Sequence, residues 1–484
     1  MEQNKLYIKA RGFFEELSQI PRGSGNTEAV SAWLQKWGRD RNLFVVRDVM
    51  GNVYMRRDET PDKDPTLLQG HMDMVCEKDS GVKHDFNSDP IYLSEEDGKL
   101  TAIGTTLGAD NGVGVALALA AMDSIDELKP VEALFTADEE IGLLGAADFD
   151  MDITTANRLI NIDSGGDGVV VVGSAGGERE KLILFYDAIP AVNTPVLISL
   201  DGLKGGHSGT EIGAGNKNAL CVMGRVLNDL YSDRPFNLIS LNGGLKGNAI
   251  PRSAECVIST FDAESVIRRI AELETLIKGE FAHGDPDAES FRLKAEKIRQ
   301  SRRGDYADYS GKLSMLPPRD TGRVISLLTL APNGVVRRDG EFIITSTNLG
   351  IAATNHREGE ISFVFESRSS NESELDSVSL ALDRLAHVLT MDIEKSARYP
   401  GWKRVYNTRL QEEYREAYKK ATGGDVSMIE IHAGLECGLL ASKKPGMDVI
   451  SIGPDVSGAH TPKETLDLAS YERLCAAVYQ LLVK

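Results

Sequence analysis

The chain has 484 residues, 41% of them hydrophobic, and its 54 Lys and Arg against 73 Asp and Glu give a formal net charge of -19. This length predicts two or three domains, and the negative charge argues against nucleic acid or a membrane surface as a partner. No run of about eighteen uncharged apolar residues occurs, and the start MEQNKLYIKARGFFEEL lacks the apolar segment of a secretion signal, so we expect a soluble, cytoplasmic protein.

Up to about residue 186 the sequence alternates amphipathic helices with short apolar runs. It predicts helices at residues 11–18, 28–39 and 112–122, and buried strands at residues 65–70, 131–136 and 158–162. This alternation is typical of an α/β fold with a mainly parallel sheet.

Residues 187–397 have a different pattern, which predicts an inserted α+β domain. The segment VLISLDGLKGGHSG, a helix at residues 218–231 and FNLISLNGGLKGNAIPRSAECVIS come first. GRVISLLTLAPNGVV, EISFVFESRSS and a helix at residues 374–389 then form a second, similar set, which hints at a duplication.

The first pattern returns in residues 398–484, with helices at residues 410–422 and 471–483 and a strand at residues 448–452. We therefore predict a catalytic domain made of residues 1–186 and 398–484. Residues 187–397 would be a lid domain inserted into it.

Five cysteines are scattered along the chain without a C-x-x-C pair: Cys76, Cys221, Cys256, Cys437 and Cys475. This predicts neither a disulfide framework nor a thiolate zinc site. Any metal site would then use nitrogen and oxygen ligands.

Possible ligands of that kind follow the predicted strands. His71 and Asp73 follow the first strand, Glu139 and Glu140 the second and Asp163 the third. In open α/β sheets, ligands bind outside the carboxyl ends of the strands.

Two more candidates complete the set. Asp110 precedes the helix at residues 112–122, and His460 lies in GPDVSGAHTP after the strand at residues 448–452. The two imidazoles and three carboxylates of the set His71, Asp110, Glu140, Asp163 and His460 suit zinc, cobalt or manganese. They suit a pair of ions because a carboxylate can bridge two cations about 3.5–4 Å apart. We expect two divalent ions, zinc first, with cobalt or manganese as the alternatives.

Each candidate also has an ordinary explanation. Asp110 could be a helix N-cap, Glu139 and Glu140 could favour the start of a helix from residue 141, and Asp163 before Ser-Gly-Gly could be a turn residue. The two histidines could make ordinary hydrogen bonds or face solvent. Five candidates at one edge of one sheet favour a common site.

In this order and at these distances, GHMD, LGADNG, ADEEIGLLGA, NIDSGG, GGHSG and GAHTPKE resemble the dinuclear metallopeptidases that include aminoacylases, glutamate carboxypeptidases and dipeptidases. LGADNG and IHAGLECGLL are similar to the aminoacyl-histidine dipeptidase branch, the cytosol non-specific dipeptidases. The resemblance implies a zinc-peptidase-like catalytic domain with an inserted lid.

The resemblance also assigns roles. It divides the ligands between two ions, with His71 and Asp163 on one, Glu140 and His460 on the other, and Asp110 bridging both. Asp73 would orient the ring of His71, and Glu139 would be the general base.

In the lid, His207 of KGGHSG would stabilise the oxyanion, and Arg368 of FVFESRSS would bind the substrate's C-terminal carboxylate. Asn248 of GGLKGNAIP is a further candidate for that pocket. Glu436 of GLECG would meet the substrate's amino group, with a buried structural acid as the alternative.

The implied reaction is hydrolysis of unblocked dipeptides with broad specificity, including Xaa-His and carnosine-like substrates, by metal-bound hydroxide with a Glu general base. An aminotripeptidase, an N-acyl amino-acid deacylase and a non-catalytic binding protein are the alternatives. The chain would bind a small peptide and act as a monomer or a homodimer, with His207 supplied by its own chain or by the partner chain.

Overall fold

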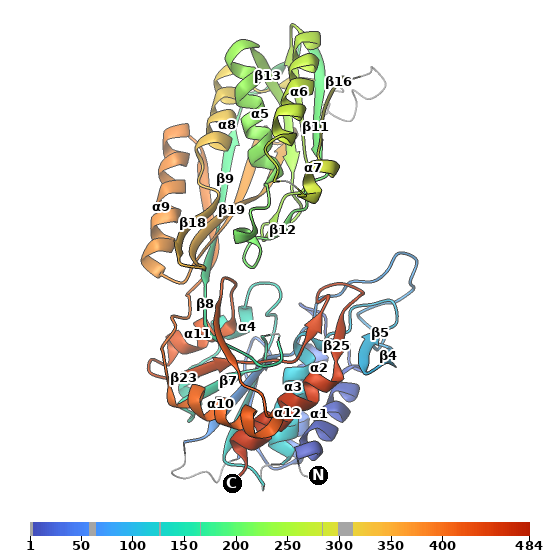
Figure 1. The fold of residues 1–484 in the computed structure, drawn as a ribbon, viewed down its shortest axis with the longest axis vertical. Helices are drawn as coiled ribbons and strands as arrows, with labels where there is room; N and C mark the ends of the chain where they lie inside the picture. Colours follow the sequence, from blue (N-terminus) through green and yellow to red (C-terminus); the bar gives the residue numbers. More distant parts are fainter. Residues whose placement is uncertain (1–2, 58–63, 125–126, 165, 283, 299–312) are drawn as a thin grey trace. The chain divides into compact units, whose positions relative to one another are not determined.

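The computed structural model describes residues 3–57, 64–124, 127–164, 166–282, 284–298 and 313–484, and the chain folds into two units (Figure 1). Unit 1 comprises Met1–Ser174 and Tyr399–Lys484, and unit 2 comprises Ala175–Arg398. The first boundary lies before the predicted one at residues 186 and 187. Strand β9 (Gly176–Phe185) accounts for the difference, because it pairs along its whole length with β20 (Glu360–Ser369) of unit 2.

In the described part of unit 1, eight strands form one sheet in the order β1-β2-β6-β3-β7-β23-β8-β22. They are β1 (Phe44–Arg47), β2 (Val53–Arg56), β3 (Thr66–His71), β6 (Val131–Thr136), β7 (Arg158–Asn161), β8 (Val169–Ser174), β22 (Ser427–Ile431) and β23 (Asp448–Ser451). The central strands β6, β3, β7 and β23 are parallel, whereas β1 and β2 join antiparallel at one edge. This confirms the predicted α/β fold with a mainly parallel sheet.

Helices cover both faces of this sheet. They are α1 (Gln3–Leu17), α2 (Glu28–Asp40), α3 (Ala109–Asp123), α4 (Leu144–Asp148), α10 (Arg409–Thr422), α11 (Glu436–Lys443) and α12 (Leu468–Leu482), with the 3-10 turn η1 (Met151–Ile153). Neighbouring strand residues point to opposite faces, so Leu68 packs in the core with α1, α3 and α12, and Leu67 packs with α4 and α11. Burial on both faces explains why two leucines stand side by side in β3, whose six residues are all buried.

A small second sheet of unit 1 has the order β24-β25-β5-β4. Its strands are β4 (Leu93–Glu96), β5 (Lys99–Ala102), β24 (Val456–Ser457) and β25 (Thr465–Asp467). The loop between β24 and β25 carries His460. Asp467 ends β25 and caps α12, accepting a hydrogen bond from Ser470 N at 2.7 Å.

In the described part of unit 2, nine strands form one sheet, in the order β16-β11-β15-β13-β19-β20-β9-β21 with β18 beside β19. The strands not yet given are β11 (Thr194–Asp201), β13 (Phe236–Gly243), β15 (Ala254–Thr260), β16 (Arg292–Lys297), β18 (Gly334–Asp339), β19 (Phe342–Asn355) and β21 (Asp392–Tyr399). Two short ladders accompany it, β10 (Ile189–Pro190) with β17 (Ser314–Met315) and β12 (Gly206–His207) with β14 (Ala249–Ile250).

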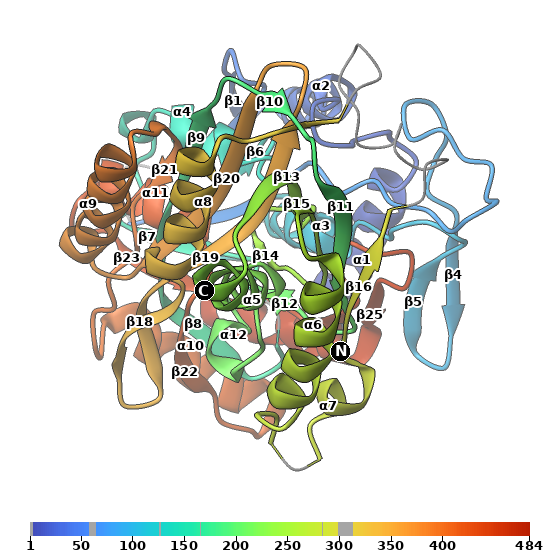
Figure 2. The same ribbon diagram turned by 90° about the horizontal axis from the view of Figure 1, so that it is seen from above.

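The helices of unit 2 are α5 (Ala219–Asp233), α6 (Ala263–Lys278), α7 (Pro286–Ser290), α8 (Pro318–Leu330) and α9 (Glu372–Leu389), with the turn η2 (Ile212–Ala214). Helices α5, α6, α8 and α9 share one apolar core with one face of the sheet (Figure 2). A smaller apolar cluster lies on the opposite face, where Met315 of β17 packs on Leu197 and Val257.

The order of elements occurs twice in unit 2. One set is β11-α5-β13-β15-α6-β16, and the other is β9-α8-β19-β20-α9-β21, with the first set inserted between β9 and α8. In the sheet, β13 and β19 lie side by side at the centre. Outward from them, β15, β11 and β16 follow on one side, and β20, β9 and β21 follow in the corresponding order on the other. The second predicted set begins with GRVISLLTLAPNGVV in the place of a strand, but this segment contains helix α8. The strand that corresponds to β11 is β9.

Candidate metal centre

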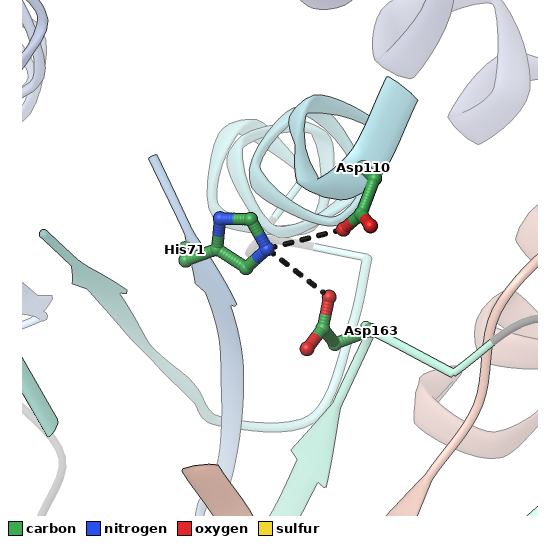
Figure 3. A group of neighbouring side chains, drawn as sticks. All are labelled: His71, Asp110 and Asp163. Carbon is green, nitrogen blue, oxygen red and sulfur yellow. Dashed lines mark hydrogen bonds and ion pairs between the residues drawn. The ribbon is translucent and has the colours of Figure 1, made fainter. Parts of the chain in front are cut away.

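The carboxyl ends of the parallel strands bring the predicted ligands together. His71 ends β3, Asp163 follows β7, and Glu139 and Glu140 follow β6. Asp110 lies in the first turn of α3, after Gly108 in the left-handed conformation, and its peptide bond to Asn111 is cis. Figure 3 shows the side chains of His71, Asp110 and Asp163 converging from these three elements.

Asp110 lies between the two histidines. Its Oδ1 is 3.1 Å from His71 Nε2, and its Oδ2 is 3.2 Å from His460 Nε2. His71 Nε2 is also 3.4 Å from Asp163 Oδ1, and His460 Nε2 is 3.0 Å from Glu140 Oε1. The two oxygens of one carboxylate therefore face two different groups of ligands.

Each group has the size of a cation site. The ligand atoms of His71, Asp110 and Asp163 lie within 4.8 Å of one another, as do those of Asp110, Glu140 and His460. His71, Glu139 and Glu140 form a third group of the same size, so Glu139 lies close enough to take part.

The donor atoms suit a divalent cation. Imidazole nitrogen and carboxylate oxygen are typical ligands of zinc, cobalt and manganese. Glu140 Oε1 is buried, and its nearest polar neighbour is His460 Nε2 at 3.0 Å. Both atoms belong to predicted ligands, and a cation between such groups would satisfy the buried carboxylate when the ring is neutral.

Before a cation binds, the carboxylates hold protons on the histidines. Hydrogen bonds to Asp110 and Glu140 raise the pKa of His460 to about 10. Burial alone lowers the pKa of His71, but the charge of Asp163 and hydrogen bonds to Asp110 and Asp163 outweigh it and raise that pKa well above its usual value.

The carboxylates of the site differ in the direction in which their surroundings shift the pKa. Burial raises the pKa of Glu139 well above its usual value and that of Asp163 to about 6. Burial also opposes ionisation of Asp110, but its hydrogen bonds to His460 and His71 lower its pKa. Acids this crowded cannot all ionise without positive charge nearby, and a bound cation supplies it.

Asp73 connects the His71 ring to the loop after β6. Nδ1 of His71 is 3.2 Å from the Asp73 carbonyl oxygen and 3.4 Å from Oδ1 of its carboxylate. The carboxylate also accepts hydrogen bonds from Ser24 Oγ at 2.8 Å, Glu139 N at 3.0 Å and Glu140 N at 3.3 Å. Asp73 therefore positions the loop that carries Glu139 and Glu140 as well as facing the ring.

A chain of buried hydrogen bonds runs beneath these ligands. Ser451 Oγ donates to Asn161 Oδ1, Asn161 Nδ2 donates to Gln69 Oε1 at 2.7 Å, and Gln69 Nε2 donates to Glu436 Oε2 at 2.5 Å. Thr136 Oγ1 donates to the same Glu436 oxygen at 2.8 Å.

Glu436 ends this chain at the start of α11. Its side chain is fully buried, and burial raises its pKa to about 7. The chain of donors beneath the strand ends therefore terminates on the residue that the resemblance assigns to the substrate's amino group.

The three remaining predicted residues lie in unit 2. His207 Nδ1 accepts hydrogen bonds from Gly209 N at 3.2 Å and Thr210 N at 3.1 Å, which places the proton of a neutral ring on Nε2. Asn248 is next to His207 in the fold, because Ala249 pairs with His207 and the Asn248 carbonyl accepts from Ser208 N at 2.9 Å.

Arg368 lies on β20 opposite Ser346 of β19, with only 7% of its surface exposed. A buried guanidinium is unusual for a strand-end arginine, which is ordinarily solvated.

Two buried charged residues beside the centre, Arg22 and Glu464, were not among the predicted site residues. Arg22 contacts backbone near Asp73, and Glu464 follows His460 by four residues and contacts the backbone of Asp110. Glu464 is the last residue of GAHTPKE, which was a signal in the sequence, whereas Arg22 lies outside all the strings that carry the resemblance. The burial of a charged residue cannot be read from its sequence position.

Clustered imidazoles and carboxylates with a further carboxylate beside them are typical of metal-dependent hydrolases. The chain belongs to one family of these enzymes, since the model of Peptidase family M20/M25/M40 matches residues 67–484. The predicted resemblance is thereby confirmed, and the chain is a peptide hydrolase.

Named relatives agree with this family. The chain is 34% identical over 482 residues to the cytosol non-specific dipeptidase of Escherichia coli (strain K12), covering 97% of this chain and 96% of that protein. A crystal structure of aminoacylhistidine dipeptidase from Vibrio alginolyticus aligns with 98% of this chain and 97% of its own, with 31% identity and a TM-score of 0.79. A crystal structure of human carnosine dipeptidase 1 shares the fold, with 12% identity, a TM-score of 0.53 and coverage of 99% and 98%. No helix within the described residues is long and apolar enough to cross a membrane.

Proposed function

We propose that this chain hydrolyses unblocked dipeptides with broad specificity, including Xaa-His substrates, and that it uses two divalent cations. The names of the Escherichia coli and Vibrio alginolyticus relatives support a dipeptide substrate and a histidine-containing one. The first of these names also supports a cytoplasmic location. Zinc is the expected metal, and cobalt or manganese are the alternatives.

The observation that carries the proposal is the placement of Asp110, whose two carboxylate oxygens lie 3.1 Å and 3.2 Å from the two histidines. His71 and Asp163 would hold one cation, Glu140 and His460 would hold the other, and Asp110 would bridge them. When bound, the cations would polarise the peptide carbonyl and lower the pKa of a bound water molecule.

Glu139 is proposed as the general base. Its Oε2 is 3.9 Å from His71 Nε2, and Asp73 fixes its backbone N–H. A carboxylate in this position can take the proton of the attacking water and pass it to the leaving amine.

Residues of unit 2 are proposed to bind the substrate. His207 would donate from Nε2 to the developing oxyanion, since the backbone donors occupy its Nδ1. Arg368 would pair with the substrate's C-terminal carboxylate, and Asn248 would donate to the same pocket. In unit 1, Glu436 would meet the amino group through Oε1, which has no hydrogen-bond partner among the described residues.

The proposal is tested by metal analysis of the purified protein together with a substrate panel. Two cations per chain and fastest turnover of free dipeptides, with Xaa-His among them, are expected. Faster turnover of tripeptides would identify an aminotripeptidase, and faster turnover of acetylated amino acids would identify a deacylase. A protein that binds both cations and hydrolyses none of these substrates would be a binding protein instead.

The origin of His207 is tested by mixing two inactive variants, Glu139→Gln and His207→Ala. If a homodimer supplies His207 from the partner chain, mixed dimers regain part of the activity. If each chain uses its own His207, the mixture stays inactive.

A further inference from the structure

A buried arginine joins two of the segments that carry metal ligands. Arg22 lies between α1 and α2 and is 2% exposed. Its Nη1 donates to the carbonyl oxygens of Met72 and Asp73, each at 3.1 Å, and its Nη2 donates to the carbonyl oxygen of Gly108 at 2.5 Å. The guanidinium therefore connects the chain just after His71 to the loop just before Asp110.

A buried glutamate joins that loop to a third segment. Glu464 is also 2% exposed and follows His460 in the loop between β24 and β25. Its Oε2 accepts from Leu107 N at 2.9 Å and Gly108 N at 3.0 Å, and its Oε1 accepts from Asp110 N at 3.1 Å. One carboxylate thus accepts three backbone hydrogen bonds from residues 107–110, and the last of these residues, Asp110, is expected to bridge the cations.

The two side chains meet at Gly108. Arg22 contacts its carbonyl oxygen and Glu464 contacts its N–H, so the residue is held through both of its polar groups. Gly108 has φ +71, and a Cβ atom there would lie 2.5 Å from Arg22 Nη2. A side chain at this position would be strained by the positive φ and would displace the guanidinium, so the contact with Arg22 requires glycine here.

We propose that Arg22 and Glu464 are positioning residues, which fix the backbone of Asp110 relative to His71 and His460 and thereby set the spacing of the two cations. The inference rests on the proposed two-cation function. Arg22 ties the segment after His71 to the loop before Asp110, and Glu464 ties that loop to the segment after His460. All six of these hydrogen bonds are made to backbone atoms. Asp110 can reach both histidines only while its backbone stays in place, because its two oxygens point to different rings.

The Glu464→Gln substitution tests this directly. A carboxamide has one acceptor oxygen, and its NH₂ group would face either Asp110 N–H or the N–H groups of Leu107 and Gly108. Two donors then oppose each other, and the loop must shift. The Arg22→Lys substitution keeps the charge but loses the fork that holds two segments at once.

The measurement is electron paramagnetic resonance of the full-length protein titrated with Mn²⁺ to one and then two equivalents. In the wild-type protein, two bridged ions are expected to give an exchange-coupled spectrum. In both variants, the second ion is expected to bind at least about tenfold more weakly, with loss of the coupled signal, while the first ion still binds.

Glu132→Gln is the matched control. Glu132 is equally buried, and its carboxylate accepts from Thr155 N at 3.2 Å, but it lies at the start of β6, away from the ligands. The control is expected to lower the melting temperature of the metal-free protein and to keep the coupled spectrum. A merely structural role of Glu464 would make its variant behave in the same way.

Glu464→Gln and Arg22→Lys proteins that bind the second ion as the wild type does, with the same coupled spectrum, would overturn the inference. If Glu464→Gln does not fold, Arg22→Lys alone decides between these results. A wild-type protein that never shows a coupled pair would instead overturn the two-cation function, and the inference with it.

Discussion

Replacing Asp73 with Asn tests how the His71 ring and the loop after β6 are held. The Asp73 carboxylate is surrounded by donors, with Ser24 Oγ, Glu139 N and Glu140 N at 2.8, 3.0 and 3.3 Å and His71 Nδ1 at 3.4 Å from Oδ1. An ionised carboxylate accepts from all of them, whereas a carboxamide turns an NH₂ group toward part of the set in either orientation. The pKa of Asp73 is lowered, because its hydrogen bond to His71 and the charge on that ring outweigh burial, so the ionised form is the native one.

The expected magnitude follows from these contacts. Hydrogen bonds to a charged group contribute about 1.5–3 kcal/mol each, so losing two of them weakens the site by roughly 3–6 kcal/mol in total. Part of this loss lowers the stability of the metal-free protein. The part that reaches the cation is expected to weaken metal affinity by about 10- to 100-fold, as for other residues that orient a ligating histidine.

The assay is competition with a zinc chelator, followed on wild type, Asp73→Asn and the control Ser24→Ala. The control removes one donor and leaves the carboxylate and its His71 contact in place, so its affinity is expected to fall by only a few-fold. Asp73→Asn protein that binds both cations within about twofold of wild type would refute the reasoning.

Three further substitutions give separate expectations. Glu139→Gln should keep both cations and lower kcat by about 10²- to 10⁴-fold, and undiminished turnover with full metal content would contradict its role as the base. His207→Ala should lower kcat by about 10²- to 10³-fold with unchanged metal affinity in a chelator competition, and an unchanged kcat would exclude an oxyanion contact. Burial raises the pKa of Glu180, on β9, from 4.5 to about 7, so its contribution to stability is present below the unfolded value and is lost as the pH rises through 7. The Glu180→Gln variant should therefore have a free energy of unfolding about 1–3 kcal/mol higher than that of wild type at about pH 8, with no such gain at about pH 4. Urea unfolding that gives the same difference between variant and wild type at both pH values would exclude this.

The fold was predictable wherever the period of apolar residues was clear. The predicted strand at residues 131–136 is β6, and the predicted helix at residues 410–422 is α10 with one more residue at its start. Residues 176–185 were predicted to lie in the catalytic domain, but they form β9 of unit 2. Its partner β20 lies far away in sequence, and such pairing leaves no local pattern. Helix α8 was missed because its apolar and β-branched residues suit a strand as well as a helix. Pro318 in its first turn is nevertheless a signal for the start of a helix.

The candidate ligands could be named from the sequence, whereas the residues that hold their backbone in place could not. His71, Asp110, Glu140, Asp163 and His460 stand in recognisable strings at strand and helix ends, and the structure brings all five together. Arg22 stands in none of these strings, and Glu464 ends GAHTPKE without being a ligand candidate. Both contact backbone atoms, and because charged residues are ordinarily exposed, the sequence does not indicate their burial. Linear sequence shows which groups can bind a metal, whereas only the folded chain shows what holds those groups in place.

Charge balance favours two cations over one. Asp110, Glu139, Glu140 and Asp163 carry four negative charges when ionised, against two histidines that must be neutral to bind a metal. A single divalent ion would leave two of these charges uncompensated in a largely buried site, and two such ions compensate all four. Among the neighbouring charged groups, Arg22 and Glu464 are opposite in sign, and the ionised Asp73 adds a negative charge that favours cations further.

The same balance predicts that protons leave as cations bind. In the metal-free protein the pKa of His460 is about 10 and that of His71 lies well above its usual value, so both rings are protonated at neutral pH. Both must lose that proton to bind a cation, so metal loading at about pH 7 should release at least about two protons per chain, and affinity should rise with pH until the pKa of His460 is passed. Calorimetric titration in buffers of different ionisation enthalpy counts the released protons. Binding of two cations without proton release would show that the carboxylates do not hold the two rings in the charged form.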